Sequence, residues 1–197
     1  MKTAVLNITP GQVVLFHNEP CLVLEHRTTG TLLMTCNQIE VAFGGSNNFA
    51  KSKLMAHLNG TFLDAMTENH ADEVLLRTVD LTAVNGSKEY GTFQCKVAPL
   101  TLDEYRRLCS IIPKPESWEW LATPWSTPQV NEDETWVAGL NANGDVHDYY
   151  YDFSGGSRPA FLIPSDYGVE VDEENPLEQY SLNELLAEIN RRVNTEE

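Results

Sequence analysis

The chain has few positive charges. Its 197 residues include 13 Lys and Arg against 29 Asp and Glu, which gives a formal net charge of −16. Proteins that bind the nucleic-acid backbone need clustered Lys and Arg, so we expect no direct nucleic-acid partner. Much of the excess negative charge lies from Asp166 onward. This pattern is more typical of a solvated acidic segment than of an inhibitor that mimics DNA.

Long apolar runs are also missing. No window approaches the roughly 18 consecutive apolar residues that a membrane span needs. The stretch from Met1 to Pro10 has one lysine and then a broken apolar run, without the long hydrophobic region and small-residue cleavage site of a signal peptide. The sequence therefore predicts a cytoplasmic protein, or one that becomes virion-associated after assembly, with no membrane partner.

Motifs for catalysis and for metal binding are absent. The chain contains no G-x-S-x-G, phosphate-binding loop, Rossmann glycine pattern or H-E-x-x-H. The histidines do not occur in the close pairs that a zinc site needs. The oxygen-rich loops between residues 131 and 148 keep a calcium ion open as an alternative, although neither matches a fixed calcium-loop spacing. We expect a protein that is not an enzyme, with no catalytic residue, no cofactor and no metal.

The cysteines are dispersed and form no C-x-x-C pair. We expect them to be reduced and buried thiols, because isolated cysteines in apolar or alternating runs usually pack as small hydrophobic residues. They are Cys21, Cys36, Cys95 and Cys109.

The remaining pattern predicts an α+β fold. Runs at 13–17, 21–26 and 31–36, with turns at 18–20 and 28–30, predict a β-meander. Ser52 is expected to cap a helix whose apolar residues recur at helical spacing, and Gly60 is expected to divide that helix into two pieces. The run 74–79 predicts a further strand, and another is expected near 95–98.

Two capping boxes predict further helices. Thr101 and Glu104 stand three residues apart, as a capping box requires, and open a helix with a buried stripe. That stripe is expected to contain Tyr105, Leu108, Cys109 and Ile112. The second box, at 181–184, opens an amphipathic C-terminal helix that follows an acidic linker.

All four tryptophans occur within 19 positions of the chain, at 118, 120, 125 and 136. A tryptophan ring favours burial and its N–H needs a hydrogen-bond partner, so such a segment forms either the centre of a core or a binding surface. Asn141 to Gly144 has the turn chemistry of a β-hairpin. Gly156 allows a close approach, and Arg158, which precedes a proline, is expected to be extended and to brace loops. The predicted structural residues are Trp118, Trp120, Gly144, Gly156 and Arg158.

This segment resembles an uncharacterised family, the domain of unknown function 6273 family of Firmicutes and their phages and mobile elements. The likeness extends from about Phe16 to Pro164. Glu119 and Ala122 depart from the family's Trp-Trp-Leu-Arg-Ser-Pro block. The matching positions are Trp120, Leu121, Thr123, Pro124, Leu140, Gly144, Val146, Gly156, Arg158, Pro159 and Ala160.

The layout is also similar, more loosely, to C-type-lectin-like domains of the formylglycine-generating-enzyme type. This resemblance implies small twisted antiparallel sheets with two or three helices and long loops. We therefore expect a lectin-like α+β domain over residues 1–165, and an acidic linker with a C-terminal helix over residues 166–197.

The aromatic run after the predicted hairpin suggests a contact surface. On an alternating strand, Tyr151 and Phe153 fall on the same side as His147. Phe153 is expected in the core, with Tyr151 as a further candidate for the core, whereas Tyr150 is expected to contact a partner together with Trp125. The predicted binding residues are Trp125, Trp136, His147, Tyr149, Tyr150 and Tyr151.

The sequence thus predicts a non-enzymatic binding or assembly protein encoded by a phage or mobile element. A protein partner or self-association is expected. The alternative is a glycan- or protein-binding module that uses the Trp125–Tyr151 loop face, and a further alternative is an acidic inhibitor that mimics DNA.

Overall fold

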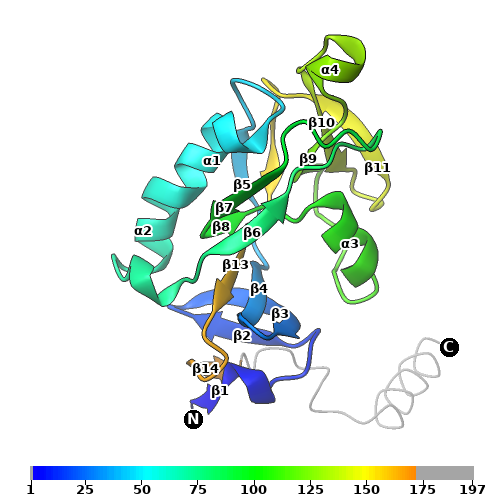
Figure 1. Ribbon diagram of the computed structural model, residues 1–197. Helices are drawn as coiled ribbons and strands as arrows, with labels where there is room; N and C mark the ends of the chain where they lie inside the picture. Colours follow the sequence, from blue (N-terminus) through cyan, green and yellow to red (C-terminus); the bar gives the residue numbers. More distant parts are fainter. Residues whose placement is uncertain (1, 172–197) are drawn as a thin grey trace, which may run out of the picture.

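A computed structural model describes residues 2–171, which form three β-sheets with short helices packed on both sides (Figure 1). The predicted α+β class is confirmed, and its lectin-like type stays a prediction. The acidic linker, the capping box at 181–184 and the predicted C-terminal helix lie outside the described residues.

The largest sheet has seven strands, and every neighbouring pair in it is antiparallel. The predicted meander forms its centre. The sheet continues to Val171, so the predicted boundary at residue 165 lies before its last strand. In spatial order the strands are β1 (Thr3–Ala4), β14 (Gly168–Val171), β2 (Val13–Phe16), β3 (Glu19–Arg27), β4 (Gly30–Thr35), β13 (Ala160–Ile163) and β8 (Val97–Ala98).

The turn between β2 and β3 lies one residue earlier than predicted. His17 and Asn18 have φ angles of 47° and 67° and form the whole loop, while Pro20 belongs to β3. Two positive φ angles give a tight loop whose twist matches that of the strands, and asparagine tolerates this conformation well.

The second sheet has five strands, of which only β9 (Glu119–Pro124) and β12 (Ser154–Ser157) run parallel. The predicted hairpin is confirmed as β10 (Trp136–Leu140) and β11 (Val146–Tyr150), and Gly144 in its loop has a φ of 85°. A separate two-stranded sheet pairs β6 (Arg77–Asp80) with β7 (Thr92–Cys95). The strand predicted at 74–79 begins only at Arg77, because Leu75 makes an isolated bridge to Leu162 instead. The five strands are β11, β10, β9, β12 and β5 (Ile39–Ala42).

The first helical region is divided as predicted. The Ser52 hydroxyl accepts a hydrogen bond from the Met55 N–H at 3.0 Å and caps α1 (Lys53–His57). A π-helical turn (Leu58–Phe62) joins it to α2 (Leu63–Met66), and Gly60 in that turn has φ −122° and ψ −109°. These angles lie outside the helical region, so the glycine marks the kink.

The capping box is confirmed at the start of α3 (Leu102–Leu108). Glu104 also forms ion pairs with the buried Arg77, at 2.5 Å, and with Arg27, at 3.0 Å. Burial alone would raise the pKa of Glu104, but Arg77, the Thr101 backbone N–H and Arg27 together hold that pKa below its ordinary value. The cap of α3 is thus also its electrostatic attachment to the sheets. The remaining helix, α4 (Pro128–Asn131), is a single turn.

The core has two hydrophobic clusters on opposite faces of the sheets. In β3, Val23 belongs to the first cluster and Leu22 to the second, and Leu33 and Leu32 in β4 divide in the same way. Strands that are buried on both faces appear in the sequence as continuous apolar runs. Helices α1 and α2 pack on the first cluster, and α3 packs on the second, so the helices lie on opposite sides in Figure 1.

The prediction for the cysteines needs a correction. None of the four forms a disulfide, but Cys36 and Cys109 are exposed, so Cys109 does not belong to the buried stripe of α3. Cys21 and Cys95 are buried, and burial raises the pKa of both thiols, that of Cys95 to about 11. A buried thiol that stays protonated is a poor nucleophile.

Candidate functional site

The β10–β11 hairpin presents two faces with different surroundings. Val137 and Tyr149 are cross-strand partners and pack on the first core cluster, whereas Ala138 and Leu140 belong to the second. Because successive side chains of a strand point to opposite faces, aromatic residues on this hairpin are separated into two groups.

The first group, the buried aromatic cluster, consists of Trp118, Trp120 and Tyr149. The Trp118 ring stacks on Tyr149 with centroids 4.2 Å apart, and it meets Trp120 edge-on at 4.7 Å. Trp120 is 1% exposed, and its indole N–H donates to the Val41 carbonyl at 2.9 Å. Trp118 and Trp120 lie where their predicted structural role requires. Tyr149, a predicted binding residue, is partly buried in the same packing.

Two glycines make this packing possible. A methyl group at Gly155 would lie 2.2 Å from the Trp118 ring, and one at Gly139 would lie 2.7 Å from the Tyr149 ring. Real Cβ atoms do not approach other atoms so closely, so these positions require glycine because of space rather than backbone angle.

A buried ion pair lies beside this cluster, where the chain passes from β12 to β13. The Arg158 Nε and Nη2 donate to both carboxylate oxygens of Glu119, at 2.8 and 2.7 Å, and its Nη1 donates to the Pro113 carbonyl at 2.9 Å. The exposed fractions of Arg158 and Glu119 are 5% and 4%. Gln38 adds a hydrogen bond to Glu119 at 3.0 Å. A buried, bidentate pair of this kind fixes the positions of both strands.

The position of this pair explains its structural role. The chain passes between the two large sheets by short connections at two places, between β4 and β5, where Gln38 lies, and at Arg158 and Pro159. Two longer connections run through β6 and β7 and through α3. Arg158 was expected to brace loops through carbonyl groups, and it does bind one carbonyl, but its main partner is Glu119. Sequence reasoning missed Glu119, although an acid at the start of the apolar run Glu119–Ala122 is the signal that could have found it.

The second group, which we call the exposed aromatic surface, consists of the exposed Trp136 and Phe153 and the half-buried Tyr150 and Tyr151. Tyr151 also packs against the first core cluster. The Tyr150 ring contacts all three others, with centroid distances of 5.8 Å to Trp136, 4.9 Å to Tyr151 and 5.8 Å to Phe153. Trp136 is 38% exposed and Phe153 is 55% exposed. The prediction that Phe153 faces the core is wrong, because β11 ends at Tyr150 and the chain turns, with the Phe153 N–H donating to the Tyr150 carbonyl at 2.9 Å.

Acidic side chains surround this surface. Hydrogen bonding to Tyr150 and the nearby Asp152 and Glu134 carboxylates raise the pKa of Tyr151. Asp148 is also exposed, on β11. The exposed rings therefore lie in a negative local potential.

The six predicted binding residues are not brought together. Trp136, Tyr150 and Tyr151 share the exposed aromatic surface, whereas Trp125 is partly buried against the second core cluster. Trp125 makes a backbone hydrogen bond to the Trp136 carbonyl at 2.9 Å, but Tyr150 is not among its ring contacts in the described residues. His147 is exposed, with its ring centroid 6.5 Å from that of Tyr149.

In the two loops that were considered for calcium, side-chain oxygens accept hydrogen bonds from the protein itself. The Asn141 Oδ1 accepts from the N–H groups of Asn143 and Asp145, at 2.8 and 3.0 Å, and the Asn131 Oδ1 accepts from the Ser126 hydroxyl at 2.9 Å. Within residues 2–171, no three His, Cys, Asp or Glu side chains are grouped closely enough to hold a metal ion. Within the same part of the chain, no helix has the length and apolar character that crossing a bilayer requires.

Comparison with known proteins adds no family to this description. No model of a known protein family matches the chain, and no curated protein or solved structure matches it either. The described residues therefore define an α+β protein in which the hairpin at one edge of the five-stranded sheet is aromatic on both faces. The resemblances drawn from the tryptophan-rich segment stay predictions.

Proposed function

We propose that this chain is a non-enzymatic binding protein whose exposed aromatic surface receives arginine-bearing segments of a partner protein. The observation that carries the proposal is a set of four rings at the surface, in which Tyr150 contacts Trp136, Tyr151 and Phe153. Large exposed apolar side chains that gather in one place mark interaction sites. Tryptophan, tyrosine and phenylalanine are enriched in the centres of such interfaces.

The chemistry of the surface favours a basic partner. A guanidinium group stacks on aromatic rings and pairs with carboxylates, and this surface offers both, through Tyr150 and through Asp152 and Glu134. The net charge of −16 would also accelerate encounters with positively charged proteins. Rings that already touch one another lose little conformational freedom on binding.

Charge also distinguishes between a different protein and a second copy of this chain as the partner. Two copies that met through this surface would bring Asp152 and Glu134 of each copy near the same carboxylates of the other, and like charges oppose such contact. The proposal therefore favours a different, basic protein. Assembly into a phage particle, the lectin-like fold and the virion or cytoplasmic location remain predictions from the sequence.

The test uses a fluorescein-labelled tetra-arginine peptide and measures binding by fluorescence anisotropy. The Trp136→Ala/Phe153→Ala double variant is expected to weaken binding about thirtyfold or more, since truncating central interface residues costs about 1 kcal/mol or more each. The matched control is Leu76→Ala, because Leu76 is 61% exposed and lies outside this surface. Its affinity is expected to stay within about twofold of the unmodified chain.

Two further measurements separate this surface from general attraction to an acidic protein. Asp152→Asn is expected to weaken binding more than Asp64→Asn, which removes an exposed charge elsewhere. Chitohexaose, a neutral oligosaccharide, serves as the competing probe. Saturable binding of chitohexaose without binding of tetra-arginine would replace this proposal by the glycan-binding alternative. Equal effects of the two Asp variants would contradict it.

A further inference from the structure

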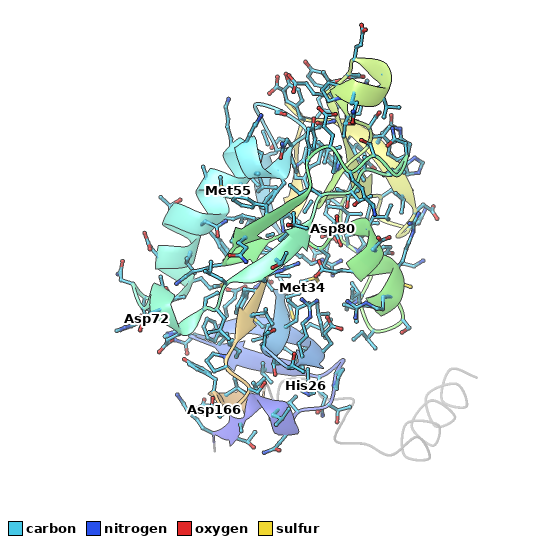
Figure 2. All side chains as sticks on the ribbon, viewed as in Figure 1. His26, Met34, Met55, Asp72, Asp80 and Asp166 are labelled. Carbon is cyan, nitrogen blue, oxygen red and sulfur yellow. The ribbon has the colours of Figure 1, made fainter. Side chains whose placement is uncertain are left out.

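A polar cavity lies at the opposite end of the molecule from the exposed aromatic surface. It has a volume of about 220 Å³ and lies beside β1, β2 and β14, at the N-terminal end of the molecule in Figure 1. Figure 2 marks this end by Asp166, which precedes the cavity residue Tyr167. The side chains that matter for its chemistry are those of Lys2, Leu15, His17, Glu68, Tyr167 and Glu170.

Two of these side chains share one carboxylate oxygen. The His17 Nε2 lies 2.5 Å from the Glu73 Oε2, and the Tyr167 hydroxyl donates to the same oxygen at 2.9 Å. The side chains of His17 and Glu73 are 16% and 32% exposed. Although burial alone would raise the pKa of Glu73, its hydrogen bonds to His17 and Tyr167 and the nearby His70 lower it, so Glu73 is an ionised acceptor at neutral pH.

An ionised Glu73 fixes the direction of both hydrogen bonds. His17 must donate from Nε2, so in the neutral ring Nδ1 is the nitrogen with a lone pair. Burial and Glu73 raise the pKa of Tyr167 to about 12, so the phenol keeps its proton and donates a hydrogen bond to Glu73. Its oxygen is then left with lone pairs only. When the His17 ring is neutral, its Nδ1 and the Tyr167 oxygen are the acceptors that remain for a further ligand.

The rest of the lining adds more acceptors than donors. Glu68 and Glu170 contribute exposed carboxylates, and Asn18 an amide that can donate or accept, while Lys2 is the one lysine or arginine among the cavity residues. Leu15 supplies apolar surface. A ligand that suits these groups has several N–H donors, a positive charge and a short apolar part.

We propose that this cavity binds a small primary alkylammonium ion. The ammonium group donates to the His17 Nδ1 and to the Glu68 and Glu170 carboxylates, and the alkyl chain lies against Leu15 and the Tyr167 ring. An ammonium over a tyrosine ring gains a further cation–π attraction. This site is independent of the exposed aromatic surface.

The test uses n-butylamine, with 1-butanol and butyrate as neutral and anionic probes of the same length. Binding is followed by two-dimensional NMR on the full chain, from the amide signal of Gly168, which lines the cavity. n-Butylamine is expected to shift this signal saturably and to bind at least about tenfold more tightly than 1-butanol. Butyrate that binds more tightly than the amine, or an amine that causes no saturable shift, would overturn the proposal.

Two variants test whether the amine binds in this cavity. His17→Asn suits the left-handed backbone at this position, where φ is 47°, and is expected to weaken amine binding about tenfold. Glu170→Gln removes an exposed charge without touching the Glu73 cluster, so it tests the site even if His17→Asn unfolds; a threefold or larger loss is expected. His57→Asn and Glu116→Gln are the matched controls, since both residues are exposed elsewhere. Unchanged amine affinity in Glu170→Gln would overturn the proposal.

Discussion

Two aromatic clusters lie on opposite faces of one β-hairpin, and they differ in the burial of their tryptophans and in the charges around them. The buried aromatic cluster, around Trp120, is enclosed by core residues and closed by the Arg158–Glu119 pair. The exposed aromatic surface, around Tyr150, has acids at its rim and ends in Phe153, which is 55% exposed. The same residue types therefore serve two purposes. Burial turns rings into a determinant of stability, and exposure leaves their faces available to a partner.

The difference between the clusters is sharpest for tryptophan. Trp120→Ala is expected to lower the free energy of unfolding by about 3–5 kcal/mol, because it removes a large buried ring and leaves a cavity. Trp136→Ala is expected to lower it by no more than about 1 kcal/mol. Urea denaturation of both variants measures the two values. Equal losses would contradict the division into a structural and a surface cluster.

The Arg158–Glu119 ion pair gives the next largest expected effect on the free energy of unfolding. Arg158→Met leaves the Glu119 carboxylate buried without its cation, and is expected to lower the free energy of unfolding by about 3 kcal/mol. The double variant Arg158→Met/Glu119→Met removes both charges and is expected to be more stable than Arg158→Met alone. If the double variant were the less stable of the two, the pair would not be the source of the effect.

Glycine packing gives a smaller effect. Gly155→Ala places a methyl group against the Trp118 ring and is expected to lower the free energy of unfolding by about 1–3 kcal/mol. Trp118→Leu shortens the side chain that the methyl group meets. The Gly155→Ala/Trp118→Leu double variant is expected to lose less free energy of unfolding than the two single variants lose together. A double-mutant cycle measures this difference. If the two losses in free energy of unfolding were simply additive, the methyl group at position 155 and the Trp118 ring would not be in steric contact.

Phe153 gives the smallest expected effect on stability. Phe153→Ala is expected to change the free energy of unfolding by less than about 0.5 kcal/mol, because an exposed side chain gains little from packing. A loss above about 2 kcal/mol, measured by thermal or urea unfolding, would place Phe153 in the core as the sequence first suggested.

Local patterns predicted the elements well. The meander, the Ser52 cap, the kink at Gly60, the Thr101–Glu104 capping box and the Asn141–Gly144 hairpin all follow from short-range chemistry that the sequence displays directly. Long-range features were harder. Alternation predicted a buried Phe153, but alternation holds only while a strand continues, and the sequence does not mark where β11 ends.

The site depended on pairings that are distant in the chain. Glu119 and Arg158 are far apart in sequence, and only the return of β12 beside β9 brings them together. His17, Glu73 and Tyr167 come from a hairpin turn, a short helical turn and a loop, so no spacing rule connects them. Trp125 and Tyr150 show the reverse error, since closeness in the sequence suggested a shared surface that the strands do not form.

The most direct test of the two-cluster account uses the four indole N–H signals as separate reporters. A ¹⁵N-labelled chain is titrated with the tetra-arginine peptide, and the signals are assigned with single Trp→Phe variants. The account predicts that the Trp136 signal shifts saturably while that of Trp120, bonded to the Val41 carbonyl, stays in place. A stationary Trp136 signal, or an equal shift of the Trp120 signal, would contradict it.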